Sequence, residues 1–224
     1  MTTHETLFDA VRSGTVEDLR YFIEEKKADV NAKEMFGYTA LHLAAGGDSL
    51  ELVRYLVLNG KADIDARTDD GQTPLHNAAR YRQHATSVEI VKFLVSQRKE
   101  SICAKGNVCT KGNVCAKDND DCTPLHPAAY SGNTEVVKIL VQAGKACMGE
   151  AYVNMPANSG ITPLHRAVLM GEVETVKALV SMGADVNIRE KKSGFTPLDF
   201  AIQKRDMALL GCLSHLGNAE GQFE

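Results

Sequence analysis

Four cysteines and a histidine lie close together in the stretch CAKGNVCTKGNVCAKDNDDCTPLH, from Cys103 to His126. Thiolates and imidazoles are the ligands that zinc prefers, and neighbouring thiols can also respond to redox state. Cys103, Cys109, Cys115 and Cys122 are separated by five, five and six residues. Zinc sites usually contain cysteine pairs only two to four residues apart. The spacing therefore does not favour a compact zinc site, and we assign no metal ligand.

The same stretch is internally repetitive, which suggests a simpler origin. A hexapeptide occurs three times in succession, as CAKGNV from Cys103, CTKGNV from Cys109 and CAKDND from Cys115. A tandem duplication would lengthen one loop and copy its cysteine without any ligand chemistry. We favour this interpretation. A metal or redox role of the Cys103–Cys122 loop and a partner-binding role of the enlarged loop stay open, because loops often carry function.

Composition and charge limit the class of protein. The chain has 224 residues, of which 44% are hydrophobic, and a net charge of −4. It has no run that approaches five or six consecutive basic residues, no basic and apolar start typical of a signal peptide, and no apolar run long enough to span a membrane. We expect a soluble, monomeric, cytoplasmic protein with reduced thiols that binds neither nucleic acid nor membranes. Nuclear entry and export by a host-cell invader are also compatible with this sequence.

A heptapeptide recurs along the chain and determines the predicted fold. It reads TALHLAA from Thr39, TPLHNAA from Thr73, TPLHPAA from Thr123, TPLHRAV from Thr162 and TPLDFAI from Thr196, with a degenerate earlier copy, ETLFDAV, from Glu5. Successive copies start 34, 34, 50, 39 and 34 residues apart. Repetition at a period of this size is typical of a solenoid, in which each unit packs on the next.

Each unit is predicted to form two helices and a turn. The motif Thr suits a helix N-cap, and the Pro that often follows it suits the first helical position. A second segment with apolar residues at helical spacing follows, such as ELVRYLV from Glu51. Two residues before the motif Thr, most links carry a glycine suited to a turn with positive φ: Gly37, Gly71, Gly160 and Gly194. Asp121 takes this place in the remaining link, and we expect it to adopt the same conformation.

This pattern resembles the ankyrin repeat family, for which T-P-L-H-x-A is a signature. The resemblance extends from about Glu5 to Leu213 and implies an all-α repeat solenoid of stacked helix-turn-helix ankyrin units with hairpin-like loops. We predict a single ankyrin-repeat domain over residues 1–216, with repeats starting near 5, 39, 73, 123, 162 and 196, followed by a frayed tail over residues 217–224.

Four histidines, His42, His76, His126 and His165, occupy one equivalent position in successive units. Packed helices lie about 8–10 Å apart, so these side chains are too distant from one another to share a metal ion or relay protons. We therefore assign them a structural role. The resemblance implies that each one forms hydrogen bonds around the Thr of its own motif.

Two further segments are longer than their counterparts. The segment Arg80–Ser87 has four additional residues, and the link from Gly144 to Gly160 has about five. Longer surface loops cost little free energy, so we interpret both as tolerated loop growth, with partner binding as the alternative.

The sequence contains none of the common catalytic signatures. It has no G-x-G-x-x-G motif after a strand, no Walker loop, no H-E-x-x-H and no G-x-S-x-G. We predict that the protein is not an enzyme and has no catalytic residues and no cofactor.

Solenoids present an extended concave surface that suits a protein partner. The resemblance implies that the hairpin tips and the exposed end of each first helix make the contacts. The predicted partner-binding residues are Met35, Phe36, Tyr38, Arg67, Asp69, Asp70, Gln72, Arg80, Tyr81, Tyr130, Ile161, Leu169, Met170 and Phe195. Several of them are large apolar residues, which are enriched at interfaces.

We thus predict a non-enzymatic protein–protein interaction module, either an adaptor or an inhibitor, that binds another protein on its concave surface. The first alternative is a metal- or redox-responsive binding protein that uses the Cys103–Cys122 loop. The second is a scaffold that recruits an enzyme.

Overall fold

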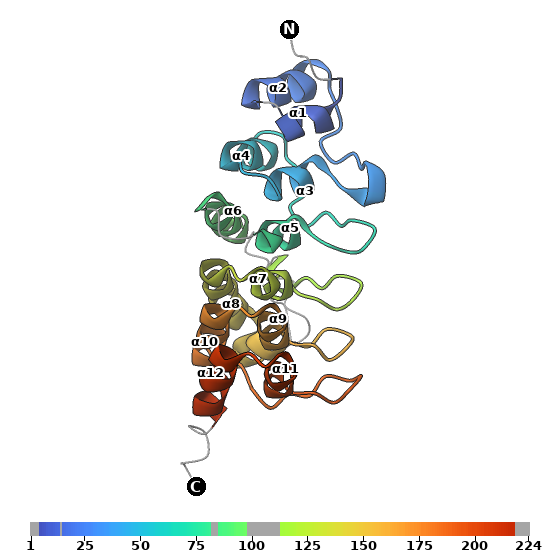
Figure 1. Ribbon diagram of the computed structural model, residues 1–224. Coiled ribbons are helices and arrows are strands. Elements are labelled where there is room, and N and C mark those ends of the chain that lie inside the picture. Colours follow the sequence, from blue (N-terminus) through green and yellow to red (C-terminus); the bar gives the residue numbers. More distant parts are fainter. Residues whose placement is uncertain (1–4, 14, 82–84, 98–112, 218–224) are drawn as a thin grey trace.

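The computed structural model describes residues 5–13, 15–81, 85–97 and 113–217, and it forms an elongated stack of helix pairs (Figure 1). In each pair, the first helix lies next to the hairpin-like links, which project to one side of the stack. The second helix lies on the opposite side. The predicted all-α repeat solenoid is confirmed.

The first helices form an inner layer beside the hairpin-like links. They are α1 (Leu7–Ser13), α3 (Ala40–Ala45), α5 (Pro74–Arg80), α7 (Leu125–Ser131), α9 (Pro163–Met170) and α11 (Pro197–Lys204). The second helices form an outer layer. They are α2 (Val16–Arg20), which continues as the π-helical turn η1 (Tyr21–Glu25), α4 (Leu50–Leu58), α6 (Ala85–Ser96), α8 (Thr134–Met148), α10 (Val173–Ser181) and α12 (Met207–Gly217). Short 3₁₀ turns occur at η2 (Met35–Gly37), η3 (Asn113–Cys115) and η4 (Gly149–Asn154).

Equivalent leucines from both layers build the core between successive pairs. At most 1% of the surface of each of these leucines is exposed. On the inner helices they are Leu41, Leu75, Leu125 and Leu164, and on the outer helices Leu56, Leu94, Leu140 and Leu179. Because no single helix pair can bury both of its apolar faces alone, the stack is stabilised by contacts between neighbouring pairs.

The motif histidines link each unit to the next. In the second unit, the backbone N–H of Thr39 donates to Nδ1 of His42 (3.2 Å), and Nε2 of the same ring lies 3.0 Å from the Gln72 carbonyl oxygen. Since Nδ1 accepts, the proton is on Nε2, which donates to the carbonyl group. Nε2 of His76, His126 and His165 likewise lies 3.0–3.2 Å from the carbonyl oxygens of Cys122, Ile161 and Phe195, respectively.

Burial keeps these imidazoles neutral. It lowers the pKa of His76 and of His126 to about 4 and also lowers the pKa of His42 and His165. The expected hydrogen bonds around the motif Thr are confirmed. The described part of the chain contains no group of three or more His, Cys, Asp or Glu residues that could hold a metal ion.

In two copies of the motif, an aspartate takes the place of the histidine that accepts hydrogen bonds from the N-cap Thr. Asp199 accepts hydrogen bonds from both the N–H and the hydroxyl group of Thr196, each at 2.8 Å. In the first copy, Thr6 and Asp9 form the same arrangement, so the cap is Thr6, one residue after Glu5. The carboxylate therefore replaces the imidazole as acceptor at the helix start, but it does not donate to a next unit.

The predicted positive-φ turns are confirmed. The φ angle is 74° at Gly37, 76° at Gly71, 82° at Gly160, 72° at Gly194 and 60° at Asp121. Phe36 also has a positive φ, of 62°, which the sequence did not indicate because a bulky side chain is strained there.

The long link after α8 is not a loop, which corrects our interpretation of loop growth. It extends α8 to Met148 and then forms the 3₁₀ turn η4, which buries Tyr152 completely. The Tyr152 hydroxyl donates to the Val114 carbonyl oxygen (2.9 Å), and its ring lies so close to Gly144 that an added methyl group would overlap it. The additional residues thus form a packed junction with the end of the preceding link.

Several predictions concern residues outside the described ranges. These are the duplicated segment up to residue 112, residues 82–84 of the other enlargement, and residues 218–224 of the predicted tail. Of the tail, the structure describes Gly217, which belongs to α12. The boundary at residue 216 stays a prediction.

Candidate protein-binding surface

Successive hairpin-like links are joined to one another at their tips. In each case a backbone N–H of one link donates to a carbonyl oxygen of the link before it, over 2.8–3.0 Å. The pairs are Asp69 to Phe36, Asn119 to Asp70, Asn158 to Asp120 and Lys191 to Ser159. The links therefore form a continuous wall beside the inner helices (Figure 1).

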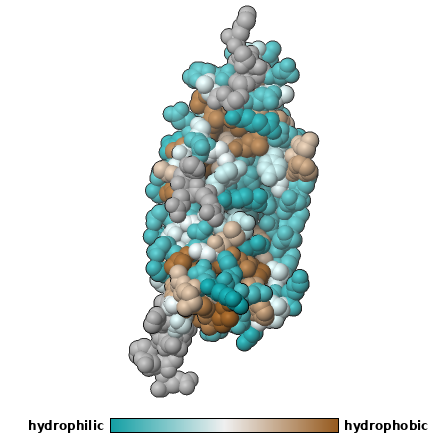
Figure 2. All heavy atoms as spheres, in the orientation of Figure 1, coloured by the Kyte–Doolittle hydropathy of each residue, from teal (hydrophilic) through white to brown (hydrophobic). Residues whose placement is uncertain are grey.

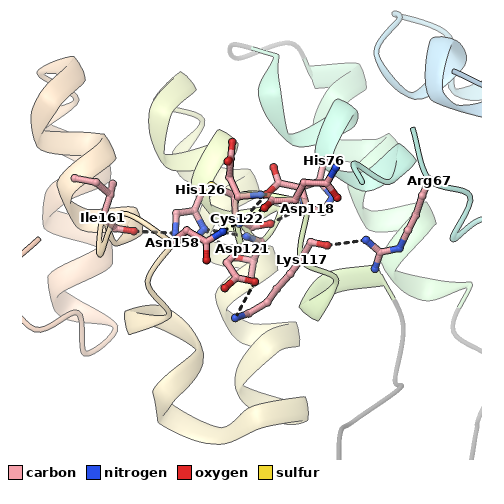
Figure 3. A network of polar contacts seen from close by, with 12 residues as sticks. Arg67, His76, Lys117, Asp118, Asp121, Cys122, His126, Asn158 and Ile161 are labelled. Carbon is pink, nitrogen blue, oxygen red and sulfur yellow. Dashed lines mark hydrogen bonds and ion pairs between the residues drawn. The ribbon is translucent and has the colours of Figure 1, made fainter. Parts of the chain in front are cut away.

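Polar side chains reinforce this wall in the middle of the stack (Figure 3). The Arg67 guanidinium group donates to the carbonyl oxygens of Gly71 (2.9 Å) and Lys117 (2.6 Å), and thus joins two links. Asp118 Oδ1 accepts the N–H groups of Asp120 (3.0 Å) and Cys122 (2.8 Å) within its own link. Arg67, a predicted partner-binding residue, is therefore already used to hold the wall.

A pocket of about 400 Å³ lies between this wall and the inner helices α5, α7 and α9, and we call it the central pocket. Its lining residues are Gln72, His76, Arg80, Asp118, Asp120, Cys122, His126, Pro127, Tyr130 and Arg166. The lining combines two guanidinium groups, two carboxylates and one exposed phenol ring. It can thus bind a polar or charged group of a partner, and Tyr130 offers apolar contact area beside it.

Three of the fourteen predicted partner-binding residues line the central pocket, namely Gln72, Arg80 and Tyr130. Tyr81 is outside the lining and lies against Gly46 of the preceding unit, with 49% of its surface exposed. Met35 and Phe36 belong to the 3₁₀ turn η2 in the first link and do not line the pocket.

Other predicted partner-binding residues are less exposed to a partner than the sequence suggested. Five of them are only half-buried: Tyr38, Ile161, Leu169, Met170 and Phe195. Tyr38 packs edge-on against His42, with ring centroids 5.7 Å apart, and Phe195 packs against Phe200 at 5.5 Å. Part of the apolar preference before the motif Thr therefore reflects packing within the unit.

The sequence reasoning missed Arg166, Asp118 and Asp120. Arg166 follows the motif His directly, at the fifth motif position. The other copies have Leu43, Asn77, Pro127 and Phe200 at this position. The signal was available, because a position that varies between copies while its neighbours repeat is not needed for the fold, and Arg166 is the one charged residue among the five.

The central pocket does not activate a nucleophile. Burial and the nearby Asp118 carboxylate raise the pKa of the Cys122 thiol, so it stays protonated at neutral pH. Burial also raises the pKa of Asp118, although its two backbone hydrogen bonds and Arg166 oppose this shift. Cys122 therefore lacks the features of a redox-reactive cysteine, and Cys103 and Cys109 lie outside the described residues.

A family model described as ankyrin repeats (3 copies) matches residues 7–106, 102–190 and 151–216. The chain belongs to the ankyrin repeat family, whose repeats are generally protein–protein interaction modules. The part of the chain that the structure describes has no helix that is long and apolar enough to cross a membrane.

Two curated relatives are Nuclear factor NF-kappa-B p105 subunits. The subunit of Mus musculus is 30% identical over 95 residues, and that of Gallus gallus is 28% identical over 96 residues. The matches cover 42% and 43% of this chain but only 10% of each relative.

A crystal structure of an ankyrin repeat domain from Acinetobacter baumannii AYE is similar to this chain in fold. The similarity covers 94% of this chain and 97% of that domain, with a TM-score of 0.69 and 23% identity. This structural similarity concerns the fold alone.

Proposed function

We propose that the protein is a non-enzymatic interaction module, an adaptor or an inhibitor, that binds a partner protein on the surface formed by the inner helices and the links. One observation carries this proposal. The repeated Thr, Leu and His positions are buried in the four units that start at Thr39, Thr73, Thr123 and Thr162, and of these positions only the rings of His76 and His126 reach the central pocket. Most of the remaining side chains that the inner helices contribute to the pocket come from positions that vary between units, such as Arg80, Tyr130 and Arg166. The repeated residues thus maintain the fold, and the variable residues that line the pocket are available to a ligand.

Exposed aromatic residues support the same surface. Tyr81 and Tyr130 have 49% and 45% of their surfaces exposed, and both lie at the C-terminal ends of inner helices. Tyrosine is enriched among interface hot spots because it buries a large area in a partner at a low cost in conformational entropy. Figure 2 shows a predominantly hydrophilic middle of the stack, with apolar patches nearer its two ends. A partner bound along the links would therefore meet both polar and apolar contacts.

The test begins with capture of a partner on the immobilised chain and measurement of its Kd. Tyr81→Ala and Tyr130→Ala should each weaken binding by at least about 1–2 kcal/mol and change thermal stability little. Glu51→Ala is the matched control, because Glu51 is exposed on the outer helix α4, and its Kd should equal that of the wild type.

The activity of a captured partner also distinguishes a scaffold from an inhibitor. An enzyme that is captured and stays active would indicate a scaffold, whereas loss of its activity would indicate an inhibitor. If neither tyrosine substitution changes the Kd, the partner does not bind on this surface and the proposal is wrong.

A further inference from the structure

Arg166 is the most unusual polar residue of the central pocket. It projects from α9, and the residue is half-buried. The contact that the structure gives it is a weak one, in which one terminal nitrogen lies 4.0 Å from Sγ of Cys122. Among the described residues, its Nε is the one buried side-chain nitrogen or oxygen atom without a hydrogen-bond partner.

An unpaired buried donor in a native protein requires an explanation. Leaving a buried donor without a hydrogen-bond acceptor lowers the stability of the fold, and more so when the group is charged. The nearby Asp118 carboxylate does not accept a hydrogen bond from Nε of Arg166. Asp118 Oδ1 accepts the N–H groups of Asp120 and Cys122, and Asp118 acts on Arg166 through its charge, since Arg166 opposes the rise in the pKa of Asp118. Apart from the weak contact with Cys122, the terminal nitrogens of the guanidinium group can therefore donate to a group from outside.

The rest of the pocket fits an anionic group of limited size. Arg80 lines the same pocket and adds a second positive charge, and its guanidinium group donates to Gln72 Oε1 (3.1 Å). A pocket of about 400 Å³ is at the small end of the range for ligand sites, which suits one side chain better than a folded element. Asp118 and Asp120 also line the pocket and would repel an anion, so the bound group must be directed toward Arg166 and Arg80.

We infer that the central pocket is a subsite for a carboxylate side chain, an aspartate or glutamate, of the partner segment that binds along the links. The two terminal nitrogens of the planar Arg166 guanidinium group match a carboxylate in bidentate geometry. The carboxylate would accept hydrogen bonds from them, and Arg80 would stabilise its charge. This inference rests on the proposed function, because it assigns one contact on the same surface.

The subsite can be tested without knowing the partner. In a ¹⁵N–¹H correlation spectrum, the Nε–H signal of Arg166 is assigned by its loss in Arg166→Lys. The chain is then titrated with N-acetyl-glutamate N-methylamide. The matched neutral and cationic probes are the corresponding glutamine and lysine derivatives. Arg54, on the outer face of α4, provides an internal control signal.

We expect the glutamate probe to shift the Arg166 signal in a saturable manner and to leave the Arg54 signal unchanged. The glutamine probe should bind at least about tenfold more weakly, because its hydrogen bonds are not charge-assisted. Absence of a shift with glutamate, or an equal response to glutamine or lysine, would overturn the inference.

Affinity for a captured partner separates this inference from the proposed function. Arg166→Gln should weaken binding about tenfold or more, and Arg166→Lys, which keeps the charge but loses the fork, should have an intermediate effect. Both variants should stay folded, since each removes an unpaired buried donor. If Tyr81→Ala weakens binding but Arg166→Gln does not, the surface is correct and the carboxylate subsite is wrong. If neither does, the proposed function is wrong, and the probe titration still decides whether the subsite exists.

Discussion

Tyr152 and Arg166 both depart from the repeat pattern, but they depart in opposite ways. Tyr152 stands where the other links have an aspartate, such as Asp63 or Asp185, whose carboxylate accepts the N–H two residues later. Tyr152 is fully buried and its hydroxyl group has a partner within the chain. Arg166 is half-buried beside a pocket, and its Nε has none. Tyr152, whose hydroxyl group has a partner within the chain, therefore maintains the fold. Arg166, which has a donor without a partner and lies beside a pocket, indicates a ligand site.

The two residues should therefore respond differently to substitution. Changes at the junction of Tyr152, Gly144 and Val114 should alter stability without altering the central pocket. Changes at Arg80, Tyr130 and Arg166 in the pocket should alter binding without altering stability.

Tyr152→Ala should lower the free energy of unfolding by about 3–5 kcal/mol, because it leaves a cavity against Gly144 and an unpaired Val114 carbonyl group. Tyr152→Phe should cost only about 1 kcal/mol, since it removes the hydrogen bond and keeps the ring. Urea denaturation measures both. Under conditions where the variants are folded, the response of Arg166 to the glutamate probe should be unchanged. A small effect of Tyr152→Ala on stability would mean that the junction is not integral to the stack.

Acid should destabilise the protein through its buried histidines. The pKa of His76 and of His126 is about 4 in the folded state, against a usual value of 6.5, so the unfolded chain binds more protons between these values. Stability from these two groups is thus complete above about pH 6.5 and is lost as the pH falls toward 4. At pH 5 the loss should be about 2 kcal/mol for each histidine.

Urea denaturation between pH 7.5 and 5 checks this prediction. His76→Gln is the informative variant, because it removes one of the four imidazoles whose pKa is lowered and should reduce the loss of stability at pH 5 by about 2 kcal/mol. A stability that does not change between pH 7.5 and 5 would show that the rings are not held neutral.

Phe36→Gly should stabilise the fold by about 1 kcal/mol, since glycine adopts a φ of 62° without the strain that phenylalanine has there. Little packing is lost, because 67% of the Phe36 surface is exposed. If Phe36 is an interface anchor, the same change should weaken a captured partner. Asp70→Gly is the matched control, because Asp70 has the equivalent place in the next link but no positive φ, and it should not stabilise. A loss of stability in Phe36→Gly would contradict the assignment of strain.

The sequence predicted the scaffold well and the candidate site only in part. Motif spacing located the inner helices, and the link glycines and Asp121 have the expected φ, because each of these features depends on local backbone preferences that repeat. The unpaired state of Arg166 could not be predicted, since it depends on how Asp118 in a different link uses its oxygens. The burial of Tyr152 was equally hidden, although an aromatic residue at an aspartate position was a visible sign.

The duplicated hexapeptides are a third departure from the repeat, and we expect them to affect neither stability nor binding. Deletion of residues 102–113 removes twelve residues and restores the spacing of the other links, because Leu94 to Thr123 would then match Leu56 to Thr73. It keeps Val114, which is fully buried and accepts the Tyr152 hydroxyl group, and Cys115. Shortening a loop to about half its length gains only about 0.6 kcal/mol of closure entropy, so the change in unfolding free energy should be below about 1 kcal/mol.

The same deletion removes Cys103 and Cys109, and it therefore also tests the metal- or redox-responsive alternative. We expect an unchanged Kd for a captured partner and the same zinc content before and after deletion, measured on reduced protein. If the deletion abolishes binding while Tyr81→Ala and Arg166→Gln do not, the partner binds the duplicated loop. The binding site of this chain would then lie in the duplicated loop and not in the central pocket.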